Sequence, residues 1–301
     1  MAKIQPWQLA QKQSLPLDCK IQLSELRIRQ WYSHWQGQVY VSFSGGKDST
    51  ALLHLVRSIH PDVPAVFVDT GLEFPEIRDF VKATENVVWL KPKKTFRRVL
   101  QEEGYPVVSK RVARYVWDLR RPVEINPNTR NLRLTGMNQA GTFCPTMKLS
   151  DKWLYLKDAP FLISSKCCDI MKKEPFHRYT RESGRKGING TMAADSQQRR
   201  GNYMRTGCNA FDANDPQSKP LSVWLEKDVW EYLKTKSIPY SKIYDMGYDR
   251  TGCVFCAFGV HLEKEPNRFQ RMKETHPRLW KYCMDRLGMR EVLEHIGVPS
   301  E

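Results

Sequence analysis

The stretch Val39-Tyr40-Val41-Ser42-Phe43-Ser44-Gly45-Gly46-Lys47-Asp48-Ser49 decides the fold class of this chain. Its first five residues are typical of a short strand, its glycines of a turn, and the apolar spacing of residues 50–56 of a helix. The same alternation recurs downstream, with strands predicted at 65–68 and 87–90 and helices at 76–83 and 95–103. Such alternation predicts an α/β fold with an open, mostly parallel sheet and helices on both faces.

Outward from this core, the pattern predicts three parts. Apolar residues among charges predict a helical N-terminal segment at 1–38. The α/β domain is expected to extend over 39–260. Residues 261–301 are expected to form C-terminal helices. Within the domain, residues 104–147 are rich in Pro, Asn and Arg, so we expect an irregular segment there. Residues 161–163 and 190–193 are expected to form further strands.

The glycine turn has the chemistry of a phosphate-binding loop. Glycines let backbone N–H groups approach an anion, and the helix that begins at Lys47 adds its dipole. Ser44, Lys47 and Ser49 offer further donors, and we expect Lys47 to be exposed. The loop is not a Walker A motif, because Asp48 follows the lysine where a hydroxyl residue would stand. The alternative is an ordinary glycine turn.

The composition indicates anionic partners. The 301 residues carry 48 Lys plus Arg against 33 Asp plus Glu, a formal charge of +15. This excess suits nucleotides, sulfated metabolites or nucleic acid, although a solvated basic face is the alternative. The basic residues cluster at 91–98, 110–121 and 199–200. Without a signal peptide or an apolar run of about 20 residues, the chain is expected to be soluble and cytoplasmic, with no membrane partner.

Four of the eight cysteines are spaced for metal binding. They are the adjacent pair Cys167-Cys168 and the CxxC motif of Cys253 and Cys256. Four thiolates complete a 4Fe-4S cluster or a zinc site, and unligated thiols are the third possibility. Zinc ribbons normally use two CxxC motifs, so the adjacent pair favours iron. A large chain needs no disulfides for stability, and a reducing compartment is expected.

Two motifs resemble a known family. SGGKDS at 44–49 resembles the PP-loop of the ATP pyrophosphatases, and DTGLEFPE at 69–76 is similar to a motif of the phosphoadenosine phosphosulfate (PAPS) reductase family. The resemblance implies a sheet of five or six strands that binds an adenine nucleotide. Residues 190–199 resemble the family's second anion loop. The nucleotide-binding residues implied are Ser44, Gly45, Gly46, Lys47, Asp48, Ser49, Asp69, Thr70, Gly71, Ser196 and Arg199.

The cysteines also resemble those of relatives. The pair, the following Lys172 and Lys173, and the later CxxC resemble the cluster motif of adenylylsulfate reductases, which implies a 4Fe-4S cluster on Cys167, Cys168, Cys253 and Cys256. Cys144 falls where many relatives carry a cysteine near the substrate, which makes it a candidate sulfur carrier. Cys208 is a weaker candidate, and a plain thiol is the alternative for both. Cys19 and Cys283 are expected to be packing residues.

One departure from the family directs the functional hypothesis. The reductases resembled use a cysteine in a C-terminal ECGxH-type tail, and no cysteine follows Cys283 here. We therefore expect an ATP-dependent sulfurtransferase that acts on a nucleobase, a nucleoside or nucleic acid. It would use ATP, Mg²⁺, a 4Fe-4S cluster and a sulfur donor, with Lys47, Asp48 and Cys144 as catalytic residues. A sulfonucleotide reductase is the second hypothesis, and a nucleotide- or DNA-binding iron-sulfur regulator is the third.

Overall fold

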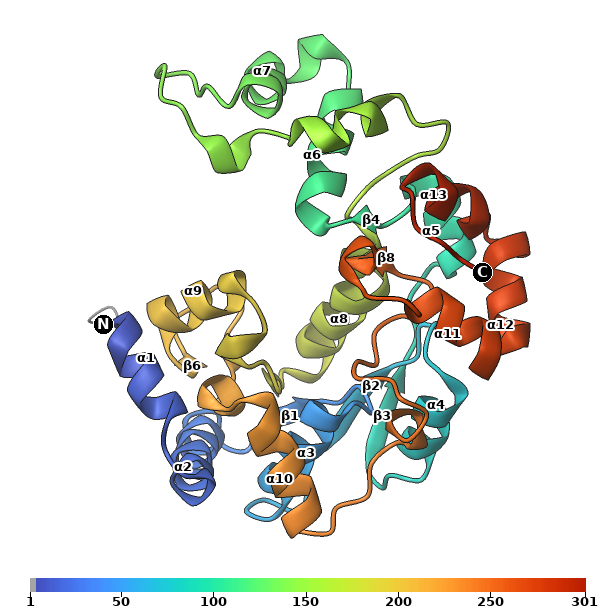
Figure 1. Ribbon diagram of the computed structural model, residues 1–301. Coiled ribbons are helices and arrows are strands. Elements are labelled where there is room, and N and C mark those ends of the chain that lie inside the picture. Colours follow the sequence, from blue (N-terminus) through green and yellow to red (C-terminus); the bar gives the residue numbers. More distant parts are fainter. Residues whose placement is uncertain (1–3) are drawn as a thin grey trace. The chain divides into compact units, whose positions relative to one another are not determined.

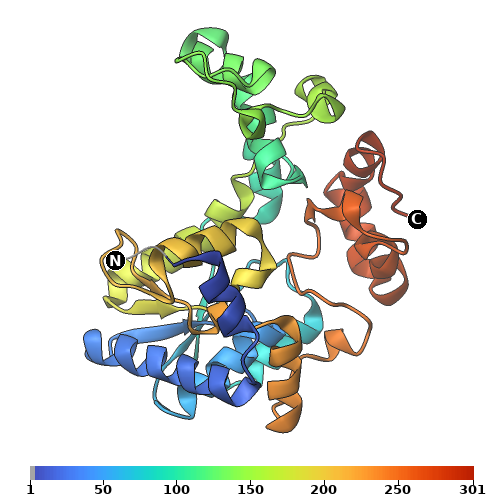
Figure 2. The same cartoon turned by 60° about the vertical axis from the view of Figure 1, so that its left-hand side comes forward.

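The computed structural model describes residues 4–301 and is drawn in Figures 1 and 2. The first three residues of the predicted segment 1–38 lie outside the described residues. The chain divides into two compact units. The first holds residues through Asp69, Glu73–Lys91 and Pro175–Thr251, and the second holds Thr70–Leu72, Pro92–Glu174 and Gly252–Glu301. The boundaries expected near residues 38 and 260 stay a prediction.

The first unit is built on a six-stranded sheet with the order β3-β2-β1-β5-β7-β6. All neighbouring pairs are parallel except β6 and β7. The strands are β1 (Val39–Ser42), β2 (Ala65–Val68), β3 (Val87–Leu90), β5 (Lys186–Ile188), β6 (Asn209–Ala210) and β7 (Gln217–Ser218). The predicted α/β class and mostly parallel sheet are therefore confirmed.

Helices pack against both faces of this sheet. The helices of the unit are α1 (Pro6–Gln13), α2 (Leu17–His34), α3 (Lys47–Arg57), α4 (Pro75–Lys82), α8 (Glu174–Ser183), α9 (Gln197–Thr206) and α10 (Glu226–Thr235). Tyr40 and Phe43 point to opposite faces because they are three residues apart along one extended run. Tyr40 contacts Tyr179 of α8, and Phe43 contacts Phe80 of α4. In Figure 1, α3 and α10 lie side by side.

A buried ion pair ties the N-terminal helices to α10. Lys20 of α2 is only 1% exposed, and its Nζ lies 2.6 Å from Oδ2 of Asp228. The same Oδ2 accepts the N–H of Leu225, which precedes α10. The carboxylate thus neutralises a buried lysine and also caps a helix, so its loss would leave a buried charge without a partner.

The second unit holds a short parallel pair, β4 (Val107–Val108) with β8 (Ala257–Phe258). Its helices are α5 (Phe96–Glu103), α6 (Lys110–Arg120), α7 (Pro127–Thr135), α11 (Arg268–Thr275), α12 (Pro277–Lys281) and α13 (Met289–His295). Figure 2 shows α11, α12 and α13 gathered at the C-terminal end of the chain, as the sequence predicts. No helix within residues 4–301 has the length and apolar character needed to span a membrane.

Three local predictions are wrong. Residues 104–147 contain the regular helices α6 and α7, because Ser109 and Asn126 cap their first turns. Residues 190–193 form no strand but lead into a single 3₁₀ turn at Ala193–Asp195. Residues 161–163 contribute only one isolated bridge, between Ile163 and Tyr105.

Candidate functional site

The phosphate loop, residues 44–49, connects β1 to α3 and is held by its own hydrogen bonds. Ser49 Oγ accepts the N–H of Ser44 at 3.1 Å and donates to the carbonyl of Gly46 at 2.8 Å. Gly45 has φ +70°, and a Cβ there would lie 2.9 Å from side chains of α4. Only glycine fits this position without a shift of the packed helix.

Lys47 is buried, which corrects the expectation that it is exposed. Its residue is 5% exposed, and its Nζ lies 3.0 Å from Glu226 Oε1 and 2.9 Å from the carbonyl oxygen of Asp249. Burial alone would lower the pKa of Lys47, but the carboxylates of Asp48 and Glu226 outweigh it and raise that pKa. The ammonium therefore stays charged, and Glu226 holds it beside the loop.

A segment that sequence reasoning missed covers the start of α3. Tyr244 Oη accepts the backbone N–H of Lys47 at 2.8 Å and lies 3.3 Å from Thr251 Oγ1. A Cβ at Gly46 would lie 2.6 Å from the same threonine oxygen. One of the N–H groups available to a phosphate at this helix start is thus occupied by a phenol oxygen. No local motif marks Tyr244, because the contact spans 197 residues.

Asp48 has an unsatisfied oxygen. Its Oδ1 is buried and has no hydrogen-bond partner within residues 4–301. Burial raises the pKa of Asp48 and the nearby Asp195 and Glu226 add to the shift, while Lys47 and Arg199 oppose it. A buried carboxylate oxygen among other carboxylates is suited to a hard cation.

The second anion loop, residues 190–199, lies against the phosphate loop. A Cβ at Gly190 would be only 3.0 Å from the carbonyl oxygen of Asp48. Ser196 Oγ accepts the N–H of Arg199 and caps α9, and the Arg199 guanidinium pairs with Asp195. The structure thus brings two loops together that are about 140 residues apart in the sequence, and it neutralises the arginine internally.

The predicted Asp69-Thr70-Gly71 motif follows β2, whose carboxyl end lies beside that of β1. Asp69 is buried, and its Oδ2 pairs with Arg78 at 2.8 Å. Thr70 Oγ1 accepts the N–H of Leu72 at 3.2 Å, and Gly71 has φ +74°. Asp69 belongs to the first unit and the next two residues to the second. Their role in nucleotide binding stays a prediction.

The second unit holds all four cysteines predicted to bind metal, called here the cysteine quartet: Cys167, Cys168, Cys253 and Cys256. Burial raises the pKa of Cys167, and each of the other three thiols raises it further, so the four lie within electrostatic reach of one another. Burial likewise raises the pKa of Cys256 to about 11, with Cys253 and Cys168 contributing. Lys172 opposes the shift at Cys167.

The quartet supplies four sulfur donors that could bind a metal. Within residues 4–301, no three His, Cys, Asp or Glu side chains are arranged to hold a single metal ion. The number and the chemistry of the donors fit a cysteine-ligated cluster.

The other cysteines differ in exposure. Cys144 is partly exposed in the second unit, with its Sγ 3.8 Å from the carbonyl of Thr142. Cys283 is fully buried, which confirms it as a packing residue, whereas Cys19 is exposed and its predicted packing role is wrong. Cys208 lines a cavity of the first unit.

Comparison with known proteins gives the following matches. The phosphoadenosine phosphosulfate reductase domain matches residues 38–142 and 145–258. An uncharacterized protein of Methanocaldococcus jannaschii is 26% identical over 275 residues, which are 88% of this chain and 52% of that protein. The chain spans about half the length of this and a second archaeal relative. Adenosine 5'-phosphosulfate reductase of Staphylococcus epidermidis is 24% identical over 239 residues, 77% of this chain and 76% of that enzyme.

Two solved structures are similar to this chain. Phosphoadenylyl-sulfate reductase from Candida auris, in complex with phosphate, gives a TM-score of 0.43 at 17% identity over 80% of this chain and 96% of its own. The U34-tRNA thiolase NcsA from Methanococcus maripaludis, with its 4Fe-4S cluster, gives 0.39 at 14% identity over 91% of this chain and 80% of its own.

Proposed function

We propose, from the premise that this chain belongs to the phosphoadenosine phosphosulfate reductase family, that it is an ATP-dependent sulfurtransferase. The observation that carries the proposal is the unpartnered Oδ1 of Asp48 beside the phosphate loop. A buried carboxylate repels a polyphosphate unless a divalent cation bridges the two. This arrangement favours Mg²⁺-ATP as the substrate, with Asp48 as the residue that would hold the metal.

The proposed reaction has two steps. An acceptor carbonyl oxygen attacks the α-phosphorus of ATP and pyrophosphate leaves; a sulfur nucleophile then displaces AMP. On ATP binding, the Lys47 ammonium would leave Glu226 and pair with a phosphate. The N–H groups of Gly45 and Gly46 would stabilise the charge that develops on that phosphate. Ser196 and Arg199 are assigned to a second anionic group, and Arg199 would release Asp195 to reach it.

The cysteine quartet is proposed to hold a 4Fe-4S cluster. When bound, such a cluster supplies a redox-active centre whose potential depends on the hydrogen bonds and charges around its sulfurs. The residues of this chain that would tune it are Lys172, which opposes the rise in the pKa of Cys167, and Arg268, which opposes the rise in the pKa of Cys256. Cys144 is proposed as the sulfur carrier.

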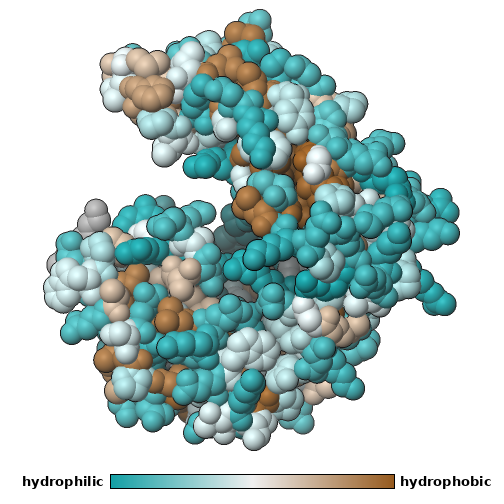
Figure 3. Space-filling model, in the orientation of Figure 1, coloured by the Kyte–Doolittle hydropathy of each residue, from teal (hydrophilic) through white to brown (hydrophobic). Residues whose placement is uncertain are grey.

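For the acceptor, the surface of α6 favours nucleic acid over a free nucleobase. Lys110, Arg111 and Arg114 are exposed and have no ion pair among the residues that the structure describes. Ile125 and Phe143 of the same unit are 55% and 58% exposed, and Figure 3 shows apolar residues among hydrophilic ones in this part of the surface. A unit that exposes unpaired cations as well as aromatic and apolar side chains suits a single-stranded nucleic acid.

The test uses anaerobically purified full-length protein with Mg²⁺-ATP, sodium sulfide and cellular RNA. We expect RNA to stimulate the release of AMP and pyrophosphate, with sulfur appearing in the RNA. With sulfide, which attacks the adenylated acceptor directly, Cys144→Ser should alter neither rate. When sodium polysulfide replaces sulfide, its sulfane sulfur can load Cys144 as a persulfide, and Cys144→Ser should then slow sulfur incorporation more than pyrophosphate release, because adenylation needs only the phosphate loop. Cys19→Ser, which changes an exposed thiol, is the matched control and should alter neither rate.

A sulfonucleotide reductase is the second candidate, favoured by the similarity to Staphylococcus epidermidis adenosine 5'-phosphosulfate reductase over 77% of the chain. In a parallel reaction the protein receives adenylylsulfate or its 3'-phosphorylated form together with reduced thioredoxin. Sulfite release at about 1 per second or faster, without pyrophosphate release from ATP, would replace the sulfurtransferase proposal with this one.

A further inference from the structure

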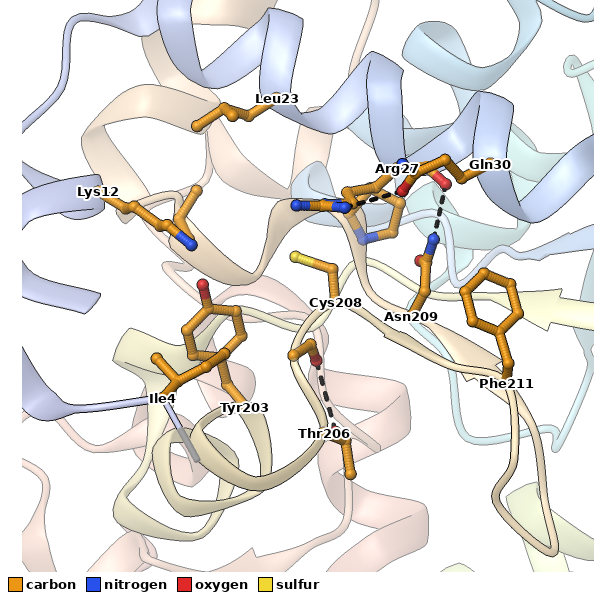
Figure 4. A pocket seen from close by; sticks show the side chains of 13 residues that line it. Ile4, Lys12, Leu23, Arg27, Gln30, Tyr203, Thr206, Cys208, Asn209 and Phe211 are labelled. Atoms are coloured by element: carbon orange, nitrogen blue, oxygen red, sulfur yellow. Dashed lines mark hydrogen bonds between the residues drawn. The ribbon is translucent and has the colours of Figure 1, made fainter. Parts of the chain in front are cut away.

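A cavity of about 210 Å³ lies in the first unit, apart from the phosphate loop. Helices α1 and α2 form one side, and the end of α9 with the start of β6 forms the other (Figure 4). The backbone N–H of Ile4 donates to the carbonyl of Met204 at 3.0 Å and closes one end. Several waters, or one small molecule, would fill this volume, since a water takes about 30 Å³ of liquid.

The polar groups of the cavity converge on one point. In Figure 4 the Cys208 thiol, the Lys12 ammonium, the Arg27 guanidinium and the Tyr203 hydroxyl all point inward. Tyr203 is 3% exposed, and its hydroxyl has no hydrogen-bond partner among the residues described. Because it has no partner within residues 4–301, this hydroxyl is available to donate a hydrogen bond to a ligand in the cavity.

The lining carries positive charge without a counter-charge. It includes two cationic residues and no aspartate or glutamate. The Arg27 guanidinium donates to Gln30 Oε1 at 2.8 Å and makes no ion pair within the described part of the chain. An anion would therefore be attracted, and the Tyr203 hydroxyl would donate to it. The Cys208 thiol faces the same point, which adds a sulfur nucleophile to an anion pocket.

The position of the cavity connects it to the site. Cys208 accepts the N–H of Lys219 through its backbone carbonyl at 2.8 Å, at the end of β7. Because β6 runs antiparallel to β7, Cys208 lies at the carboxyl edge of the parallel strands, the edge from which the phosphate loop extends from β1. Strands β5 and β7 separate β1 from β6.

We propose that this cavity is the entry site for a small anionic sulfane donor of the thiosulfate class, and that Cys208 accepts the sulfur. The Cys208 Sγ attacks the outer sulfur of thiosulfate, the sulfur–sulfur bond breaks, and its electron pair leaves with sulfite. The products are a Cys208 persulfide, which retains one proton, and sulfite, so that atoms and charge balance. Arg27 and Lys12 stabilise the departing dianion. This inference rests on the proposed sulfurtransferase function, for which it names the donor.

The surroundings of the Cys208 thiol shift its pKa in both directions. Burial raises the pKa of Cys208, while the nearby Arg27 and Lys12 and a hydrogen bond from Ser222 oppose this shift. Burial also raises the pKa of Tyr203 to about 12, so the phenol remains a donor. A protonated thiol resists adventitious oxidation, so Cys208 should react chiefly with a donor that binds beside it.

The experiment supplies thiosulfate labelled in its outer sulfur to full-length protein without ATP or acceptor. Mass spectrometry of the Cys208 peptide should show the gain of one sulfur atom, which cyanide removes. Cys208→Ser and Cys208→Ala should take up none at this position, and Cys19→Ser should match the wild type. Arg27→Gln should slow uptake about tenfold, the effect of losing a charge-assisted contact. Tyr203→Phe should slow it less.

Each remaining outcome overturns the proposal. Label on a different cysteine, uptake unchanged in Arg27→Gln, or no uptake in the wild type all exclude Cys208 as the acceptor. Because this assay needs neither adenylation nor RNA, its failure is distinct from failure of the sulfurtransferase reaction. A protein that transfers sulfur from sulfide but takes none from thiosulfate would retain its proposed function and lose this donor.

Discussion

The phosphate loop and the cysteine quartet differ in whether their charged groups have partners within the protein. At the phosphate loop, cations and an N–H donor already have partners inside the protein: Lys47 with Glu226, Arg199 with Asp195, and the Lys47 N–H with Tyr244. In the quartet, burial and the neighbouring thiols raise the pKa of Cys167 and of Cys256, and Lys172 and Arg268 offset only part of this rise. The phosphate loop can fold without its ligand, because groups of the protein already pair with its cations and with one N–H. The four thiols of the quartet lose their protons and become stable thiolates only when a metal cation binds them.

The largest effect is therefore expected in the quartet. Cys256→Ser should reduce iron from about four atoms per chain, as in a 4Fe-4S cluster, to less than one, and lower the thermal stability, because metal binding contributes to folding. Iron analysis of anaerobically purified protein and thermal unfolding measure the two effects. Cys19→Ser should change neither. One zinc per chain in the wild type, in place of iron, would show that the quartet does not bind a 4Fe-4S cluster.

A smaller effect on stability, but a large effect on activity, is expected at Lys47. Lys47→Gln should slow pyrophosphate release by at least about a hundredfold, since it removes a preorganised cation from the phosphates. The fold should lose only about 1 kcal/mol, because the partner Glu226 is more than half exposed and becomes hydrated. Lys227→Gln, which changes an exposed lysine of α10, is the control and should retain pyrophosphate release. Full activity in Lys47→Gln would show that the loop does not act on phosphates.

The smallest effect tests whether Tyr244 is an internal substitute for a phosphate oxygen. Tyr244→Phe leaves the Lys47 N–H without a partner in the free protein only, so ATP should bind about fivefold more tightly, in line with one net hydrogen bond. Calorimetric titration with ATP measures the change. Tyr240→Phe removes a neighbouring hydroxyl that contacts Asp245 and should leave affinity unchanged. Weaker binding in Tyr244→Phe would make Tyr244 a ligand of the nucleotide instead.

The sequence predicted what is local. The sheet and the glycine turn between β1 and α3 follow from periodicity and a short motif. The quartet was chosen from the spacing of its cysteines, and its role in binding a metal stays a prediction. Glu226 and Tyr244 could not be predicted, because their contacts with Lys47 join distant parts of the chain and involve no motif. The failed strand at 190–193 has a related cause: Gly190 approaches the Asp48 carbonyl closely, and this tertiary contact directs the backbone. Helix α6 was missed although its buried Val112, Val116 and Leu119 have helical spacing, because the Pro- and Asn-rich residues after it indicated a loop.

The buried pair of Lys20 and Asp228 has a consequence for how the chain tolerates change. Asp228 fixes the first turn of α10, and the first residue of that helix is Glu226, the counter-ion of Lys47. A truncation that removes α2 would take away the counter-ion of Asp228 and the helix that packs around it, and would loosen the turn that presents Glu226. The N-terminal helices are therefore not a detachable extension. Shortened versions of the protein, whether natural or engineered, should keep them if the lysine of the phosphate loop is to stay in place.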